Sequence, residues 1–524
     1  MIPLPEIFNA ASHFIDRNVL EGRAAKIAIE CGDERVAYAQ LLERTNRAGN
    51  ALARLSVRAG DRILLLLLDS PDFLYTFFGA IKIGAIPVPA NPFLKPAEIE
   101  YLLNDSLAVA VILSEDSLAA WRSIPRARLP HLREVVVSGA APSEFPLLRE
   151  LLAAASASLD AAPARRDAPA FWLYSSGSTG PPKACIHLQR DMVVSTELYA
   201  KNILGMNDRD RCYSVARLFF AYGLGNAGYF PLGCGATTIL SPARPSPAGI
   251  YADIARYRPT LFFSVPSNYA ALLAHSSPAA RDFDLSSIRH AVSAGEALPA
   301  PIFDRFKQRF GIEILDSLGS TECLQMVIAN RPGDVRPGSS GKLIPGYEAR
   351  IVDERGADVP PGEIGNLLIK GDSLCAGYFN QPEKTRAVFT GGWFRMGDKY
   401  SRDADGYYWY AGRADDIFKV NGRWLSPAKV ESELVAHPAV REAAVIARED
   451  RDGLPKPAAY VVVQDGSAPT AEFAAELQAW LAEKLPTYQR PQWIEFLPDL
   501  PKTATGKLQR YKLRELQSHR PTSS

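Results

Sequence analysis

Residues 174–187 read YSSGSTGPPKACIH, a run of hydroxyl-bearing and glycine residues followed by a lysine. The apolar residues FWL come directly before it, which is typical of a strand leading into a loop. Glycines let backbone N–H groups approach oxyanions, while Ser and Thr hydroxyls and Lys183 add donors and positive charge. The composition favours a phosphate-binding loop, although a flexible surface loop would have the same composition.

Two common phosphate motifs are excluded by their spacing. A P-loop requires GxxxxGK followed by Ser or Thr, so that a hydroxyl meets Mg²⁺ beside the lysine. Here Lys183 is followed by Ala184, and the GK pair at 506–507 is followed by Leu508. A Rossmann fingerprint also fails, because no GxGxxG opens a helix in the early part of the chain. A phosphate site in this chain therefore belongs to another class.

The whole chain has the composition of a globular enzyme. Its 524 residues are too many for one ordinary core, so two or more domains are expected. The net charge of +1 comes from 59 basic and 58 acidic residues, and this balance gives no indication of a nucleic-acid partner. The first residues lack the pattern of a signal peptide, and the apolar run at 63–68 is too short to span a membrane. Six dispersed cysteines without CxxC suggest reduced thiols. We expect a cytoplasmic protein that needs no membrane.

Hydrophobic patterning predicts an α/β multidomain fold. Short apolar runs alternate with amphipathic segments early in the chain, which favours βαβ units with largely parallel sheets. Beyond residue 338 a period-two alternation predicts a β-rich part, and beyond 412 two strands and the helix around 471–485 predict a small α+β domain. The predicted limits are a large N-terminal domain, 1–412, with two βαβ-type subdomains and a β-rich one (about 1–165, 166–338 and 339–412), and a small C-terminal domain, 413–524.

Five further motifs follow the loop in order: SAGEALP (293–299), DSLGSTE (316–322), GGWFRMGD (391–398), YAGRADDIFKVNG (410–422) and PKTATGK (501–507). With the loop, they resemble the motifs of the adenylate-forming superfamily, which includes acyl-CoA synthetases, peptide-synthetase adenylation domains and firefly luciferase. The loop of that family runs Tyr-Thr-Ser-Gly-Thr-Thr-Gly-x-Pro-Lys-Gly, and this chain departs from it at Ser175, Ser178 and Ala184. The resemblance implies a small, mobile C-terminal lid domain and activation of a carboxylate by ATP.

In that family, AMP is transferred to a carboxylate and pyrophosphate leaves, so the resemblance implies ATP and Mg²⁺ as cofactors and coenzyme A as cosubstrate. Thr321 would bond the α-phosphate, Glu322 would ligate Mg²⁺, and Lys507 would neutralise charge between the carboxylate and the α-phosphate. These three are the expected catalytic residues. The expected ATP-binding residues are Ser175, Ser176, Gly177, Ser178, Thr179, Gly180, Lys183, Gly295, Glu296, Asp316, Thr321, Asp398, Arg413 and Lys507.

Some of these roles have plain structural alternatives. The resemblance implies that Asp398 accepts both ribose hydroxyls and that Arg413 reaches the ribose. Asp398 could instead cap a turn, and Arg413 could be an ordinary surface cation. The residues 295–296 would line the adenine.

The resemblance also implies that the small domain rotates between two half-reactions. Asp415 would be the hinge, and Val420, Asn421 and Gly422 would border the tunnel for the pantetheine of CoA. A plain turn would also explain Val420 to Gly422. PKTATGK resembles the pattern around lysines that bacterial acetyltransferases modify, so Lys507 is a candidate for acetylation and deacetylation, which would remove its charge.

The acid pocket is expected near RLFFAYGLGNA, 217–227, where aromatic walls beside small residues suit a flat, compact acid. This wording resembles bacterial benzoate–CoA ligases, although the aromatic cluster could simply be core. Leu318 departs from the aromatic residue that the family commonly has there. The predicted pocket residues are Phe220, Ala221, Tyr222, Gly223, Leu318 and Gly319.

The expected reaction converts an aromatic acid, benzoate in the first place, to an acyl-AMP and then to benzoyl-CoA, with release of AMP and pyrophosphate. A ligase for a substituted benzoate and a stand-alone adenylation enzyme that loads a carrier protein are the alternatives. A luciferase-like oxygenase and a non-catalytic nucleotide-binding regulator are disfavoured, the second because Glu322, Asp398 and Lys507 are intact. Either a monomer or a homodimer is compatible with the sequence.

Overall fold

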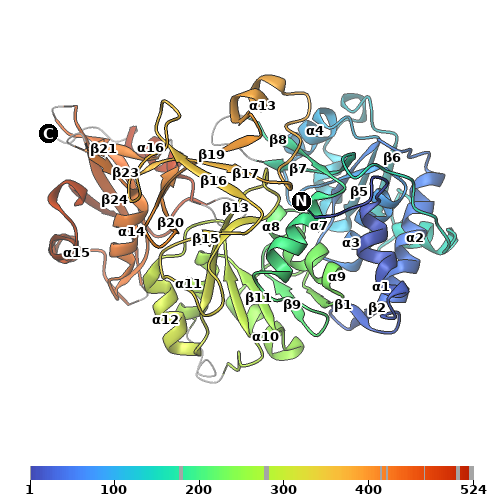
Figure 1. Ribbon diagram of the computed structural model, residues 1–524, viewed down its shortest axis with the longest axis horizontal. Helices are drawn as coiled ribbons and strands as arrows, with labels where there is room; N and C mark the ends of the chain where they lie inside the picture. Colours follow the sequence, from blue (N-terminus) through green and yellow to red (C-terminus); the bar gives the residue numbers. More distant parts are fainter. Residues whose placement is uncertain are drawn as a thin grey trace.

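The computed structural model describes residues 2–175, 181–275, 283–413, 416–420, 423–451, 453–464, 466–502 and 508–518. It is an α/β protein with a large N-terminal domain and a small C-terminal domain, drawn in orange and red in Figure 1. The predicted fold class is confirmed. Within the described residues, no helix is both long enough and apolar enough to cross a membrane.

The first sheet has four parallel strands in the order β4-β3-β5-β6. Their bounds are β3 (Arg62–Leu66), β4 (Ile86–Pro89), β5 (Ala110–Ser114) and β6 (Glu134–Ser138). The apolar run at 63–68 contributes most of β3, and its leucines at 64–66 are inaccessible to solvent. Helix α3 (Pro71–Lys82) connects β3 to β4 and begins with a proline, whose fixed φ suits a first helical turn.

The central sheet is largely parallel in one half (Figure 1). Its strands there are β13 (Ile314–Gly319), β12 (His290–Ser293), β11 (Leu261–Ser264), β9 (Arg211–Ser214), β10 (Thr237–Leu240) and β1 (Ile27–Cys31), in that spatial order, with β2 (Glu34–Ala37) antiparallel at the edge. Strands β1 and β2 thus join a sheet whose other strands lie beyond residue 165. The carboxyl ends of β9, β11, β12 and β13 meet at one edge, where open α/β sheets bind ligands.

The other half of the central sheet is antiparallel and contains the β-rich part predicted from the alternation. It continues from β13 through β14 (Met326–Ala329), β15 (Gly341–Leu343), β20 (Tyr407–Arg413), β19 (Trp393–Arg402), β17 (Gly365–Lys370) and β16 (Glu348–Val352). The segment 339–412 is therefore continuous with the parallel half through hydrogen-bonded strands.

A separate hairpin carries the hydroxyl-rich loop. Strands β7 (Pro169–Ser175) and β8 (Lys183–Leu188) are antiparallel, with Ser175 opposite Lys183. The strand predicted before the loop is confirmed. Because the two ends of the loop are paired, the hairpin fixes where the loop starts and ends.

The small domain is built on the sheet β23 (Val440–Glu449), β24 (Pro455–Val463) and β25 (Trp493–Phe496). It also holds the hairpin β21 (Phe418–Val420) and β22 (Arg423–Leu425) and the helices α14 (Pro427–Val435), α15 (Ala471–Lys484) and α16 (Arg510–Ser518). The helix predicted over 471–485 is confirmed as α15, which buries Leu477 and Leu481. Helix α14 packs against β20 and against α12 (Ala300–Phe310) of the large domain.

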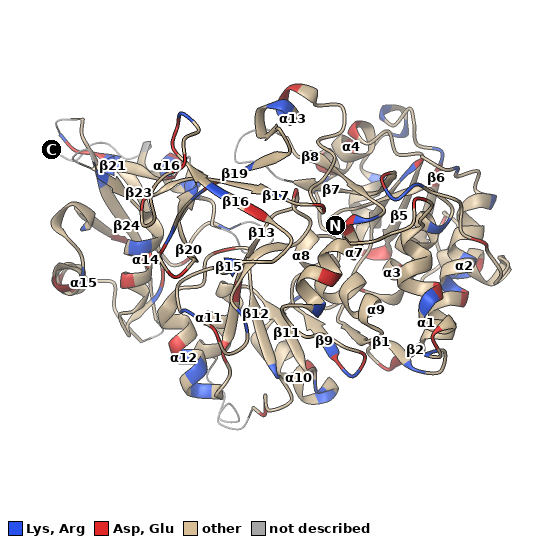
Figure 2. Ribbon diagram, viewed as in Figure 1, with Lys and Arg blue, Asp and Glu red and all other residues tan. Residues whose placement is uncertain are grey.

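Basic and acidic residues are interspersed along the described chain, as Figure 2 shows. The six cysteines are free thiols. Burial raises the pKa of Cys212 and Cys185 well above the usual value, which disfavours the reactive thiolate. This agrees with thiols that serve as small buried side chains.

Candidate active site

Backbone carbonyls at the carboxyl ends of β11 and β12 fix the aromatic segment that follows β9. The Tyr222 hydroxyl donates to the carbonyl oxygens of Ser264, at 3.1 Å, and Val292, at 3.3 Å. Tyr222 lies in the helical turn α8 (Ala221–Leu224). Its hydroxyl end is anchored, while part of its surface remains accessible. Such a ring can form a rigid wall, because its orientation is set by two hydrogen bonds.

Gln325 holds the same segment from behind. Its Nε2 donates to the carbonyl oxygens of Ala221, at 2.6 Å, and Tyr222, at 3.2 Å. Sequence reasoning gave Gln325 no role, and its position three residues after Glu322 is the only signal that could have suggested one. Among the predicted pocket residues, Phe220, Tyr222, Leu318 and Gly319 keep accessible surface, whereas Ala221 and Gly223 are buried.

Glu322 is the centre of a polar cluster at the base of the hydroxyl-rich loop. Its Oε1 accepts hydrogen bonds from the Ser175 hydroxyl, at 3.1 Å, and the Tyr378 hydroxyl, at 2.9 Å. Lys183 lies 4.5 Å from the centre of the Tyr378 ring, a cation–π contact. The structure therefore brings together three predicted residues, Ser175, Lys183 and Glu322, and adds Tyr378, which the motifs did not indicate.

The backbone of Thr321 is fixed by a buried histidine. His187 Nε2 lies 2.9 Å from the Thr321 carbonyl oxygen, so that nitrogen carries the proton, because a carbonyl can only accept. On its other side, His187 Nδ1 lies 3.1 Å from Asp191 Oδ2. His187 ends the stretch 174–187 but had no predicted role; its signal was a carboxylate four residues later. We infer that His187 fixes the orientation of the Thr321 backbone.

Asp398 and Arg413 lie opposite each other on β19 and β20. Arg413 Nη1 is 3.4 Å from Asp398 Oδ1; the Asp398 side chain is mostly buried and that of Arg413 is about half exposed. The resemblance placed both residues at the ribose, and the sheet register brings them together. A carboxylate has two oxygens and can accept two hydroxyl donors.

The small domain reaches the large one at the SAGEALP segment. The backbone N–H of Leu508 donates to Glu296 Oε1 at 2.9 Å. Leu508 directly follows the PKTATGK motif, so this bond joins the residue after that motif to the segment predicted to line the adenine. Gly295 has φ +91°, a left-handed conformation that favours glycine.

Asp316 lies behind these loops on β13. It is almost inaccessible, and burial raises its pKa to about 8, while the backbone N–H of Leu298 at Oδ2 partly opposes that rise. At neutral pH the folded protein therefore holds this carboxyl mainly protonated. Asp316 was predicted to bind ATP, and its burial suits a residue that supports the adenine segment through Leu298.

The raised pKa of Asp316 predicts a pH-dependent stability. Between the unfolded pKa of about 4 and the folded value of about 8, the folded state keeps a proton that the unfolded state has released. The free energy of unfolding should therefore fall as pH rises through this window, by at most about 3 kcal/mol from pH 5 to 7.5. Asp316→Asn, which cannot ionise, should remove that slope and leave the protein more stable than wild type at pH 8. Denaturant unfolding at several pH values measures this, and parallel profiles for the two proteins would refute it.

Nine of the predicted site residues lie outside the described residues: Ser176, Gly177, Ser178, Thr179, Gly180, Asp415, Asn421, Gly422 and Lys507. Val420, predicted at the CoA tunnel, is buried at the end of β21 within an apolar cluster that joins the two domains. Its predicted role stays a prediction.

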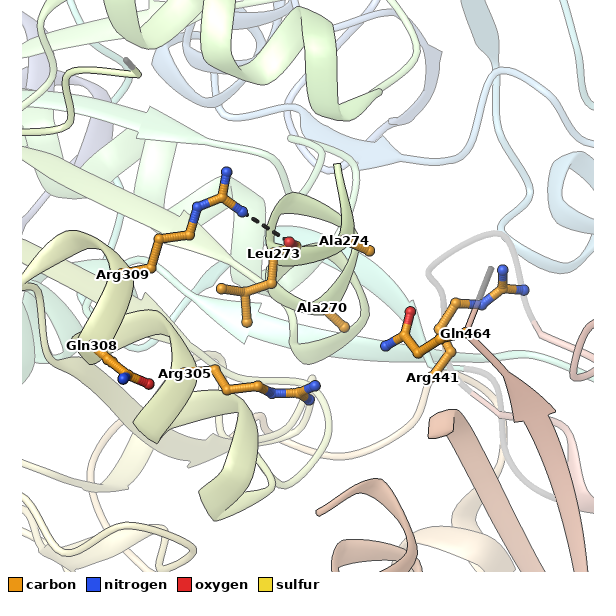
Figure 3. A pocket seen from close by; sticks show the side chains of 8 residues that line it. All are labelled: Ala270, Leu273, Ala274, Arg305, Gln308, Arg309, Arg441 and Gln464. Carbon is orange, nitrogen blue, oxygen red and sulfur yellow. Dashed lines mark hydrogen bonds between the residues drawn. The ribbon is translucent and has the colours of Figure 1, made fainter. Parts of the chain in front are cut away.

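A pocket of about 410 Å³ opens between α12, α11 (Pro266–Ala274) and the small domain (Figure 3). One wall is closed by Arg309, which donates to the Leu273 carbonyl oxygen at 2.8 Å. None of the predicted site residues lines it, so it is distinct from the candidate active site. Its lining residues are Ala270, Leu273, Ala274, Arg305, Gln308, Arg309, Arg441 and Gln464.

Comparison with known proteins decides the family. Residues 16–379 match the family model described as AMP-binding enzyme, and residues 429–507 match the AMP-binding enzyme C-terminal domain. The chain belongs to the AMP-binding enzyme family. The resemblance to adenylate-forming enzymes is therefore confirmed.

This AMP-binding enzyme is similar along its whole length to proteins that act on aromatic acids. It is 45% identical to a benzoate–CoA ligase of Thauera aromatica, over 98% of this chain and 97% of the relative. The anthranilate CoA ligase AuaEII in complex with anthranoyl-AMP is 42% identical, with a TM-score of 0.95 and 98% of each chain covered. A benzoate CoA ligase from Burkholderia xenovorans LB400 is 43% identical, with a TM-score of 0.89, over 97% of this chain and 100% of that one.

The family uses Mg²⁺ with ATP, and the donor set of this AMP-binding enzyme fits that ion. Within the described part of the chain, no three His, Cys, Asp or Glu side chains gather into a metal cluster. Mg²⁺ typically needs only one or two carboxylates when phosphate oxygens supply further ligands. Glu322 is a buried carboxylate at the base of the loop, and Tyr378 and Ser175 orient it through Oε1.

Proposed function

We propose that this protein is an AMP-forming ligase that converts benzoate, ATP and CoA to benzoyl-CoA, AMP and pyrophosphate. The observation that carries the proposal is the cluster of Glu322, Ser175, Tyr378 and Lys183 at the base of the hydroxyl-rich loop. A carboxylate, a cation and a loop rich in donors suit the triphosphate of ATP with its metal. The full-length similarity to benzoate–CoA ligases supports the choice of acid.

In the first half-reaction a benzoate oxygen attacks the α-phosphorus, the bond to the β-phosphate breaks, and pyrophosphate leaves. Bringing two anions together is the main obstacle, so positioning and positive charge should supply most of the catalysis. Glu322 would hold Mg²⁺, which neutralises phosphate charge when bound. Thr321, directed by His187, would bond the α-phosphate, and Lys507 would stand between the carboxylate and that phosphate.

In the second half-reaction the CoA thiol sulfur attacks the carbonyl carbon of benzoyl-AMP. A carbon–sulfur bond forms, the carbon–oxygen bond to the phosphate breaks, and AMP leaves with the electron pair. The thiol proton passes to solvent or to a base at the site. The resemblance implies that the small domain rotates between the half-reactions, so Lys507 would be withdrawn from the site in this step.

Tyr222 gives the proposal for the acid its sharpest test. Tyr222→Ala should remove a wall of the pocket and lower kcat/KM for benzoate by roughly ten- to a hundred-fold, the size of a moderate pocket defect. Tyr222→Phe keeps the ring and loses only the bonds to the Ser264 and Val292 carbonyls, so most of the activity should remain. Steady-state rates with benzoate measure both. Equal losses in the two variants would show that the hydroxyl matters and the wall does not.

The overall reaction is tested by pyrophosphate release with benzoate, with and without CoA, against acetate, cinnamate, hydroxybenzoates, anthranilate and amino acids. CoA-dependent turnover that is highest with benzoate is expected. Pyrophosphate exchange without transfer to CoA would favour the loading of a carrier protein. Turnover that is highest with a hydroxy- or aminobenzoate would support the same reaction with a different acid. Anthranilate is in the panel because one of the similar structures is an anthranilate CoA ligase.

Domain limits, compartment and modification complete the proposal. We propose the division at 412/413, between the two matched family segments, with subdomains near 1–165, 166–338 and 339–412. The proposed compartment is the cytoplasm, where ATP and CoA are available, and the proposed state is a monomer or a homodimer. Acetylation of Lys507 is proposed to switch off the first half-reaction, because it removes the charge.

A further inference from the structure

A cation–π contact joins the two domains at a place that no motif indicated. Lys399 is on β19 of the central sheet, and its Nζ lies 4.4 Å from the centre of the Trp424 ring. Trp424 is on β22, which pairs with β21, and β21 packs against β24 of the small domain. The contact therefore crosses from the large domain to the small one.

Lys399 is a fixed partner for this ring. Its side chain is only 6% exposed, and its Nζ pairs with Glu354 Oε1 at 2.6 Å, a bond that lowers the pKa of Glu354. A buried ammonium held in place loses little further freedom when a ring docks on it, and its attraction to the ring is stronger than in water. Lys419, from the small domain itself, approaches the same ring at 4.8 Å.

The orientation that makes this contact also makes the bond between Leu508 and Glu296. We propose that Trp424, docked on Lys399, is a positioning residue that holds the small domain where the PKTATGK motif meets the site. It does so without touching substrate. This inference rests on the proposed function, in which Lys507 serves the first half-reaction alone.

The inference predicts a split between the two half-reactions. Trp424→Leu should slow benzoate-dependent exchange of pyrophosphate into ATP by about five- to thirty-fold, since a cation–π contact of this kind contributes about 1–2 kcal/mol. Formation of benzoyl-CoA from supplied benzoyl-AMP should stay within about twofold of wild type. The second half-reaction does not need the docked orientation, so losing the contact should not slow it.

A matched control and a conservative rescue separate this role from stability. Trp493 is also half-buried, and Arg448 lies over its ring at 4.6 Å, but both residues belong to the small domain. Trp493→Leu should leave the ratio of the two half-reactions unchanged. Lys399→Met should reproduce the effect of Trp424→Leu. Lys399→Arg keeps the cation, so the ratio of the two half-reaction rates should remain that of wild type. Trp424→Leu is the primary variant. Lys399 directly follows Asp398, a predicted ATP-binding residue, so a change at Lys399 could also disturb the nucleotide site.

Hydrogen exchange of the Leu508 amide tests the same inference without any substrate. In wild type the bond to Glu296 should protect that N–H, and Trp424→Leu should speed its exchange while Trp493→Leu does not. Residue-resolved mass spectrometry of the full chain measures this. Equal losses in both half-reactions, or unchanged exchange at Leu508 in Trp424→Leu, would overturn the inference. If benzoate is not the acid, hydrogen exchange at Leu508 still tests the positioning role of Trp424, because it needs no substrate. A failure of this inference can therefore be told apart from a failure of the proposed function.

Discussion

Replacing Lys507 by glutamine is expected to slow formation of the acyl-adenylate by about 100- to 1000-fold, the usual cost of losing one preorganised electrostatic contact in a transition state. The second half-reaction, started from supplied benzoyl-AMP, should stay within a few-fold of wild type. The reason is chemical: only the first step brings a carboxylate and a phosphate together, and only there is a cation needed between them. Pyrophosphate exchange and thioester formation, measured separately, give the two rates.

Glutamine at this position also imitates the neutral side chain of acetyl-lysine, so the same variant bears on the proposed acetylation. Lys512→Gln is the matched control, because Lys512 is an exposed lysine close to the motif in sequence. It lies on α16, a helix that begins three residues after the motif. It should leave both rates unchanged. An adenylation rate in Lys507→Gln close to that of wild type would contradict the role of the lysine and would end the acetylation proposal with it.

Glu322→Gln should be the other severe variant, with a loss of about 100- to 1000-fold in adenylation at fixed Mg²⁺. Glutamine keeps an oxygen that can accept from Ser175 and Tyr378, so the fold should survive while the negative charge is lost. The rate should depend on Mg²⁺ at much higher concentrations than in wild type. A titration of Mg²⁺ against the exchange rate measures this shift.

Tyr378→Phe should give an intermediate result, because it removes one hydrogen bond that orients the carboxylate and keeps the charge. Groups that orient a metal ligand typically change metal affinity by about 10- to 100-fold. Glu348→Gln, at an exposed carboxylate on β16 paired with Lys370, is the control and should behave as wild type. An unchanged Mg²⁺ dependence in Glu322→Gln would show that the metal is held elsewhere.

Much of this protein could be predicted because its signals are local. The hydroxyl-rich loop lies between two strands of one hairpin, so a few neighbouring residues carry both its position and its chemistry. The helix α15 and the strands β23 and β24 follow from apolar spacing within single segments. The order of six motifs was enough to indicate the family, since each motif is read without knowing what lies beside it.

The tertiary structure alone decided which loops meet. Ser175 and Tyr378 reach Glu322 from 147 and 56 residues away, because the β7–β8 hairpin and the segment after β17 come together there. The order of strands in the central sheet places the ends of β11 and β12 behind Tyr222, and Gln325 closes on the same turn. No spacing in a single chain encodes that order.

The sequence also could not predict the burial of Asp316 or the contact between the two domains. Asp316 stands in a motif and reads as a ligand, yet the packing around β13 removes it from water and raises the pKa of its carboxyl. Lys399 and Trp424 each lie just after a different motif and had no predicted role, and only the docking of the domains makes them partners. The sequence by itself determined the chemistry that each motif can perform, because that depends on residue type and near spacing. Which residues hold those motifs in place depended on the tertiary structure, because solvent exclusion and long-range contact exist only once the chain is packed.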